Sequence, residues 1–258
     1  MKLREALSNT RIIRYSPGSP EVMETTATLF MRYFAGMMEL KGNPDGSETG
    51  GVLQLLQSEE KAPLGIFFTI REDGSGILAV KETCFLYSYV SHLLENCLDD
   101  QVEKYAEGKH VEPAFDWNRV TYDFFLTQEG RIQKDLDREE YVAELARLGF
   151  THAEVNGLAF PMGLETGPKG ETYPMFYTYC PALDQFVYSD LNKGLFPFYY
   201  LSANMNYMLE NARLARKYGL VPGLLCFEPR SVPEQFFEKY PMLRGARVDH
   251  PFRSFKPR

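Results

Sequence analysis

The first forty residues combine a short apolar run with one long helical pattern. Residues 11–15 are β-prone, and the turn-forming SPGSPE follows them. From Glu21 to about Leu40 apolar residues recur at helical spacing, among them Ala27, Phe30, Met31, Phe34 and Met38. A strand followed by a helix that reaches residue 40 is therefore expected.

Three further β-type runs follow a polar loop. They begin at Val52, Gly65 and Gly76, and the last two are joined by the turn-forming REDGS. Residues 82–98 then place Leu86, Val90, Leu93, Leu94 and Cys97 on one helical face. These patterns predict neighbouring strands of one sheet with a helix packed against it, and together residues 1–110 form a small α+β domain.

The stretch LDDQVEKYAEGKHVEP, residues 98–113, is charged and lacks a clear apolar period. We expect the domain boundary near residues 99–114, punctuated by Pro113. A second domain then covers residues 114–258.

Strand and helix patterns alternate in this second domain, which is typical of a parallel sheet with crossover helices. Strands are predicted at residues 120–126, 152–158 and 220–227. The first intervening helix begins at the capping residue Asp137 and ends at Gly149, with an apolar stripe of Tyr141, Val142, Leu145 and Leu148. The second runs over about residues 203–218 and ends at Gly219, with Met205, Met208, Leu209, Ala212 and Ala215 inward. A further helix is expected from Ser231.

About forty residues separate the second of these strands from its helix. They are rich in Tyr and Phe, from Tyr173 through Tyr177 and Tyr179 to Tyr200. Loops of this length are usually functional or disordered, and the aromatic content argues against disorder. The fold class predicted is α/β, with a small α+β N-terminal domain followed by the first three β/α units of an incomplete TIM-type barrel. In such a barrel a long loop after a strand lies on the face at the carboxyl ends of the strands, where active sites form.

Polar residues near the carboxyl ends of the predicted strands are the candidates for ligand binding. Asp123 interrupts an apolar strand, so it faces either the barrel mouth or a buried structural partner. Asn156 either binds a hydroxyl or forms a turn with Gly157. Glu228 and Arg230 form either a surface ion pair or a ligand contact, since an arginine binds carboxylates in bidentate fashion.

Charge, cysteines and motifs exclude several classes. A net charge of -7 over 258 residues argues against nucleic acid. The four cysteines have no metal or redox spacing, and the four histidines match no metal motif, so neither a metal nor a cofactor is expected. Phosphate-loop and hydrolase-elbow motifs are also absent. With no signal peptide and no membrane span, the sequence indicates a cytoplasmic protein, or a secreted or periplasmic one if a signal peptide was removed.

The chain resembles the family-20 glycoside hydrolases, the β-N-acetylhexosaminidases, in four runs. FTIREDGSGILAVKETCFLYSYVSHLLENCL resembles the end of their zincin-like domain, and FDWNRVTYDFF resembles their first barrel strand. REEYVAELARLGFTHAEVNGLAF and ARLARKYGLVPGLLCFEPRS resemble the helix–strand units that follow. The α-glucuronidases share this two-domain layout.

The resemblance implies glycoside hydrolysis through an oxocarbenium-like transition state, with the substrate's acetamido group as nucleophile. Two positions depart from the family pattern. Family-20 enzymes carry an Arg shortly after the Asp of the first strand, where this chain has Leu126 or a neighbour, and they carry a His near the position of Asn156. The family's catalytic Asp-Glu pair follows a fourth strand that the chain does not reach, so no catalytic residue is assigned and this part of the chain is expected to be inactive alone.

The resemblance also implies that Asp123, Asn156, Glu228 and Arg230 form one wall of a sugar site, with Tyr177 and Tyr179 as stacking residues. Three functions remain open. The chain is part of a glycoside hydrolase, a non-catalytic carbohydrate-binding or scaffold protein, or an isomerase-like barrel that uses Glu228 as a base. An incomplete barrel exposes a strand edge, so a homo-oligomer is possible.

Overall fold

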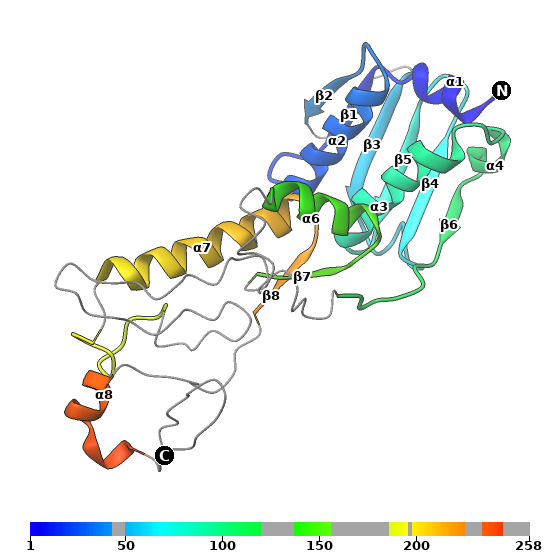
Figure 1. Ribbon diagram of the computed structural model, residues 1–258. Coiled ribbons are helices and arrows are strands. Elements are labelled where there is room, and N and C mark those ends of the chain that lie inside the picture. The colour runs from blue at the N-terminus through cyan, green and yellow to red at the C-terminus, as the bar shows by residue number, and fades with distance from the viewer. Residues whose placement is uncertain (43–49, 120–136, 156–185, 196–197, 225–233, 245–258) are drawn as a thin grey trace. The chain divides into compact units, whose positions relative to one another are not determined.

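A computed structural model describes residues 1–42, 50–119, 137–155, 186–195, 198–224 and 234–244 (Figure 1). The chain divides into two compact units. The first contains Met1–Arg119, Glu139–Ala153 and Leu214–Val221, and the second contains Val120–Arg138, Glu154–Arg213 and Pro222–Arg258. Each is described by itself below.

A six-stranded sheet forms the centre of the first unit. Its strand order is β2-β1-β3-β5-β4-β6. The neighbours β2, β1, β3 and β5 run parallel, whereas β4 is antiparallel to both β5 and β6. The strands are β1 (Ile12–Tyr15), β2 (Met38–Lys41), β3 (Val52–Gln57), β4 (Ile66–Ile70), β5 (Gly76–Val80) and β6 (Lys109–Val111).

Helices cover one face of this sheet. In Figure 1, α2 (Glu21–Tyr33) and α3 (Cys84–His92) lie side by side against it, and α3 continues as a π-helical turn, Leu93–Cys97. Alternate strand residues such as Leu53, Leu55 and Phe68 are buried under these helices. The short helices α1 (Leu3–Ser8) and α4 (Glu103–Ala106) add Leu3, Leu7 and Tyr105 to the same core. Alternation with period 2 thus places one face of the sheet in the core.

The predicted strands of the first domain are confirmed as β1, β3, β4 and β5, and the REDGS turn joins β4 to β5 as an antiparallel hairpin. The predicted helical face is also confirmed. Leu86, Val90, Leu93, Leu94 and Cys97 are all buried.

The prediction that the first long helix reaches residue 40 is wrong. Helix α2 ends at Tyr33 because Phe34 is extended and Gly36 adopts a φ of 88°. Residues Met38–Lys41 form β2, which pairs in parallel with β1, and the Met38 side chain is 63% exposed. The apolar period across Phe34 and Met38 is therefore coincidental, and a glycine in the left-handed region marks where the chain turns back.

The charged stretch at residues 99–114, predicted as a boundary, carries folded elements. Helix α4 buries Tyr105, and β6 pairs with β4, with Val111 opposite Ile66. Strand β6 lies at the edge of the sheet and pairs only with β4, so its polar residues can face solvent and its sequence shows no apolar period. The division of the chain into domains at residues 110 and 114 stays a prediction.

The later part of the chain begins a second, parallel arrangement. Arg119 pairs with His152 in parallel, and the Val221 N–H donates to the Thr151 carbonyl at 2.9 Å. The elements are α6 (Arg138–Arg147), β7 (His152–Glu154), α7 (Phe198–Lys217), β8 (Val221–Gly223), α8 (Glu234–Lys239) and a 3-10 turn, Pro241–Leu243. The protein is thus a mixed α/β fold. No described helix is both long enough and apolar enough to cross a membrane.

Two predicted apolar stripes need correction. Leu148 of the first stripe is 57% exposed, and Leu209 of the second is 56% exposed. The buried face of α7 instead contains Asn204 and Asn211. Asn211 can enter the core because its amide group donates to the Val155 carbonyl and accepts from Arg138, which compensates its desolvation. Helix α7 also begins earlier than predicted, at Phe198, so Tyr199 and Tyr200 belong to it and not to the long loop.

The glycines predicted to end the two crossover helices do so with positive φ, 86° at Gly149 and 83° at Gly219. Their surroundings differ. A Cβ at Gly219 would lie 2.5 Å from the Thr83 carbonyl oxygen and 3.0 Å from Val22 Cγ2, whereas a Cβ at Gly149 would meet nothing within 4 Å. Gly219 therefore allows the last turn of α7 to approach the backbone at the start of α3.

Gly149→Ala should cost about 1 kcal/mol, the left-handed backbone penalty alone. Gly219→Ala should cost more, about 2–4 kcal/mol, because the methyl group also collides with backbone. Urea denaturation of the two variants checks this difference. Equal losses of unfolding free energy would show that the backbone contact at Thr83 is absent in solution.

Candidate ligand-binding site

The residues predicted to bind sugar lie outside the described part of the chain. They are Asp123, Asn156, Tyr177, Tyr179, Glu228 and Arg230. Their place as a common wall stays a prediction. The described residues of the first unit form a different cavity.

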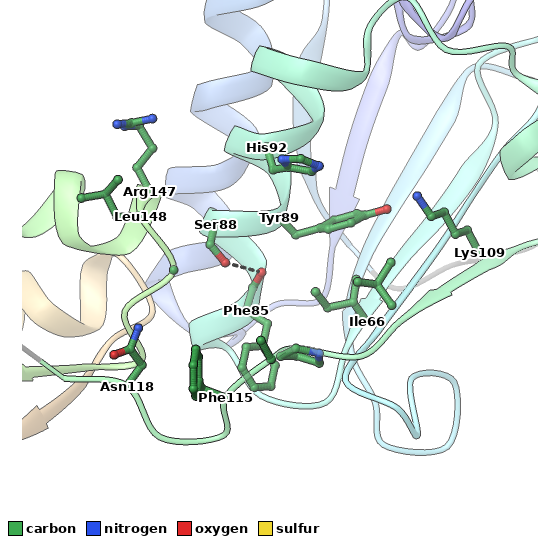
Figure 2. Close-up of a pocket in the computed structure, with 14 residues that line it drawn as sticks. Ile66, Phe85, Ser88, Tyr89, His92, Lys109, Phe115, Asn118, Arg147 and Leu148 are labelled. Carbon is green, nitrogen blue, oxygen red and sulfur yellow. Dashed lines mark hydrogen bonds between the residues drawn. The ribbon is translucent and has the colours of Figure 1, made fainter.

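This cavity has a volume of about 480 Å³ and lies beside α3 (Figure 2). We call it the α3 pocket. Helix α3 contributes four side chains at helical spacing, Phe85, Ser88, Tyr89 and His92. Because residues three and four apart share one face of a helix, the sequence presents all four to the same space.

The other walls come from distant parts of the sequence. Lys109 and Val111 project from β6 with Ile66 of β4 beside them, and Arg147, Leu148 and Gly149 close the pocket at the end of α6. The segment after β6 adds Pro113, Ala114, Phe115 and Asn118. In Figure 2 the Tyr89 ring points along the pocket toward Lys109. No Asp or Glu is among the described lining residues.

An ion-pair cluster holds the end of α6 at this pocket. Arg147 donates from Nε and Nη2 to the two oxygens of Glu144, at 2.7 and 2.6 Å, and from Nη1 to Glu95 Oε2 at 2.9 Å. Both carboxylates therefore neutralise this guanidinium, and the pKa of Glu144 lies below its ordinary range, chiefly because of the hydrogen bond from Arg147. Arg147 serves as a structural tie between α6 and the residues after α3.

Tyr89 and Tyr105 are two buried tyrosines with opposite polar environments. The Tyr105 hydroxyl donates to Asp100 Oδ2 at 2.5 Å. Tyr89 is only 6% exposed, and its hydroxyl has no hydrogen-bond partner in the described structure. Burial raises the pKa of Tyr89 well above its ordinary value, so this hydroxyl stays protonated and is available as a donor.

An aromatic pair flanks the segment that lines the pocket. The Trp117 indole lies over the His152 imidazole, with ring centroids 4.2 Å apart and planes 15° from parallel. Trp117 is 66% exposed, so its outer face is open to solvent. An exposed indole face held flat in this way suits packing against the C–H face of a sugar ring.

Hydrogen bonds hold His152 and Thr151 against the Asn118 backbone. The carbonyl of Asn118 already accepts backbone N–H bonds from Thr151 and His152, at 2.8 and 3.1 Å. The Thr151 hydroxyl accepts from the Asn118 N–H at 2.7 Å and donates to the Asn118 carbonyl at 3.0 Å. The same hydroxyl oxygen lies 2.8 Å from His152 Nδ1, so Thr151 links the Asn118 backbone to the imidazole.

A buried polar chain in the second unit fixes the carboxyl end of β7. Asn211 Nδ2 donates to the Val155 carbonyl at 2.6 Å, and Arg138 Nη1 donates to Asn211 Oδ1 at 2.7 Å. The Arg138 guanidinium also lies 4.7 Å from the centroid of the Tyr207 ring. Asn156 directly follows Val155 in the sequence, so this chain of contacts ends one residue before a predicted ligand residue.

Among the described residues, no group of three or more His, Cys, Asp or Glu side chains could hold a metal ion. Cys84 and Cys97 are free and buried, and Cys180 and Cys226 lie outside the described residues. Burial raises the pKa of the Cys84 thiol to about 11, which makes it a poor nucleophile at neutral pH.

Sequence reasoning missed the α3 pocket. Spacing alone could have shown that Phe85, Ser88, Tyr89 and His92 share a helical face. No sequence signal placed Lys109 opposite that face, because the stretch around it has no apolar period and was predicted as a boundary.

The two tyrosines should respond differently to loss of their hydroxyls. Tyr105→Phe should lower the unfolding free energy by about 1–2 kcal/mol, because it removes a hydrogen bond to a carboxylate. Tyr89→Phe should leave it unchanged or raise it by about 1 kcal/mol, since the lost hydroxyl has no partner. Urea denaturation measures both. A large loss for Tyr89→Phe would mean that this hydroxyl is bonded in the folded protein.

The pKa of His152 should lie below its ordinary value, first because burial disfavours the imidazolium and second because Arg119 is nearby. Arg119→Met should raise this pKa in an NMR titration, whereas the exposed control Arg71→Met should not. Because the unfolded chain binds the proton more readily, the unfolding free energy should fall as the pH drops through about 6.5. A His152 pKa that is the same in all three proteins would contradict the assignment.

Comparison with known proteins shows a likeness in structure alone. No protein-family model matches the sequence, and no curated protein matches it. A GH138 enzyme targeting pectin rhamnogalacturonan II superimposes on 93% of this chain with a TM-score of 0.53 and 9% sequence identity. This chain spans only 27% of that enzyme's length.

A beta-N-acetylhexosaminidase from Bacteroides fragilis aligns with 95% of this chain and 46% of its own chain. Its TM-score is 0.44 and its identity 12%. The likeness to the GH138 enzyme shows that the chain has a glycoside hydrolase-like fold, without assigning it to a particular family.

Proposed function

We propose that this chain binds carbohydrate as part of a glycoside hydrolase-like protein. The observation that carries the proposal is the shared fold, which covers 93% of the chain in an enzyme that targets a pectin polysaccharide. The finer architecture that we propose is a zincin-like domain followed by the start of a TIM-type barrel, as the resemblance to family-20 enzymes implies. The activity of a whole enzyme is part of this proposal, because the chain spans 27% of that neighbour.

Strand directions support a sugar site at the carboxyl ends of the parallel strands. Arg119 and His152 pair in parallel, and β7 pairs with β8. Ligands of parallel β/α folds bind beyond the carboxyl ends of the strands, where the loops meet. The residues that follow these three strands in the sequence include Asp123, Asn156 and Glu228.

The chemistry of these residues suits hydroxyl-rich ligands. The carboxylates of Asp123 and Glu228 can accept hydrogen bonds from sugar hydroxyls, and the Asn156 amide can both donate and accept. Arg230 can bind a sugar carboxylate in bidentate fashion. The polar chain from Arg138 through Asn211 to the Val155 carbonyl supports this wall, because a binding side chain is useful only when its backbone is held.

Glycoside hydrolysis would need a protonated carboxylic acid at the leaving oxygen, together with a nucleophile or a base. We assign neither role to a residue of this chain. The proposal is therefore carbohydrate binding by the wall described above, with hydrolysis as the reaction of the complete site. A non-catalytic binding protein would share this wall and lack the acid.

Calorimetry against neutral, acetamido and acidic oligosaccharides tests the proposal. We expect at least one class to bind and Glu228→Gln to weaken that binding about 10- to 100-fold, the effect of losing hydrogen bonds to a charged group. Glu60→Gln, an exposed residue outside both candidate sites, is the matched control. The proposal fails if no oligosaccharide binds, or if the two variants bind equally well.

A further inference from the structure

The Tyr89 hydroxyl is the first sign that the α3 pocket holds a ligand. A buried hydroxyl without a partner costs about 1–3 kcal/mol, and native proteins rarely keep such a group without a reason. The Tyr89 side chain lines the pocket, its hydroxyl has no partner in the described structure, and the residue is more than nine-tenths buried. A ligand oxygen at this point would accept the proton that no described protein group accepts.

Lys109 is the second sign. In the described part of the chain no carboxylate lies within ion-pair distance of its ammonium group, which instead lies 5.3 Å from the centroid of the Tyr105 ring. The pKa of the nearby Asp100 is lowered chiefly by the hydrogen bonds that its carboxylate accepts from Lys104 at 2.7 Å and from Tyr105, and last by the charge of Lys109. Lys109 therefore lies at the pocket wall without a described carboxylate bound to its ammonium group.

The other basic groups of the pocket are engaged. Glu144 and Glu95 neutralise Arg147. The ring nitrogens of His92 lie 3.3 Å from Asn96 Nδ2 and 3.5 Å from Cys97 Sγ. The described lining contains no acid, so the electrostatic preference of the pocket is for one negative charge, located near Lys109 and Tyr89.

The rest of the wall is apolar. Ile66, Phe85, Val111 and Pro113 line the pocket, together with Phe115, which is 66% exposed. The volume of about 480 Å³ lies within the range of small-molecule sites, roughly 300–1,000 Å³. An aromatic surface beside a single charged corner fits a ligand with one anionic group and one apolar face.

We propose that the α3 pocket is a binding site for an acidic sugar, with the sugar carboxylate received by Lys109 and the Tyr89 hydroxyl and the C–H face of the ring packed on Phe115. A carboxylate matches one ammonium and one neutral donor, whereas phosphate sites commonly recruit arginines or several backbone N–H groups. The choice of a sugar as the body of the ligand rests on the proposed function. The choice of a carboxylate rests on the pocket alone.

Calorimetry with digalacturonic acid and with its uncharged dimethyl ester tests this site in the full chain. The acid should bind, and the ester should bind about tenfold more weakly or not at all, because an ammonium–carboxylate contact is lost. Lys109→Met and Tyr89→Phe should each weaken binding of the acid about tenfold. Lys61→Met, at an exposed lysine outside the pocket, should bind like the wild type.

Four outcomes overturn the proposal: no binding of the acid, equal binding of acid and ester, unchanged binding by both pocket variants, or tighter binding of a sugar phosphate than of the acid. Tyr89→Phe removes only an unpartnered hydroxyl, so its loss of binding cannot be ascribed to unfolding if its thermal midpoint is unchanged. Glu228→Gln separates the two proposals. If binding of the acid falls only in Glu228→Gln, the α3 pocket is refuted and the proposed function stands. If binding falls only in Lys109→Met and Tyr89→Phe, the result supports the α3 pocket and counts against the sugar wall that includes Glu228.

Discussion

The close approach of the Gly219 backbone to the carbonyl of Thr83 is the constraint on which the first unit depends. It lets the last turn of α7 reach the start of α3, where Tyr218 packs edge-on against Tyr87 with ring centroids 5.2 Å apart. Arg147 ties the end of α6 to Glu95, just beyond α3. Because these contacts hold the ends of α6 and α7, Leu148 and Gly149 are fixed in place and line the α3 pocket. A cavity between elements so distant in sequence needs such fixed contacts, because loop closure must be compensated by packing.

Several charges of the first unit are paired at short range. Arg147 is held by two carboxylates, and Asp100 is held by Lys104 and Tyr105. Lys109 stands apart from this pattern, with an aromatic ring beneath it and an apolar pocket beside it. A chain with a net charge of -7 would repel an acidic ligand at long range, so recognition of a carboxylate depends on such a local positive site.

The elements that follow a clear period could be predicted from the sequence. Strands β3, β4 and β5 are short, mostly apolar runs, and burial alternates along β3 and β4. The face of α3 that holds Leu86 and Val90 repeats at helical spacing. Other features of the fold have no apolar signal for physical reasons. Gly36 turns the chain just beyond the end of α2 although apolar residues continue there, and β6 is a charged edge strand that pairs with β4 without an apolar period in its sequence. Asn211 is buried because it bonds the Val155 carbonyl, which no apolar pattern reveals. The pocket needs Tyr89 and Lys109 to meet across the fold, and only tertiary structure provides that.

A crystal structure of the chain with digalacturonic acid tests most directly whether the α3 pocket receives a sugar carboxylate. We predict ligand density in the α3 pocket, with carboxylate oxygens about 2.7–3.2 Å from both Lys109 Nζ and the Tyr89 hydroxyl oxygen and with the sugar ring lying on Phe115. Density for the acid elsewhere with the α3 pocket empty, or a ligand in the pocket with its carboxylate turned to solvent, would contradict it.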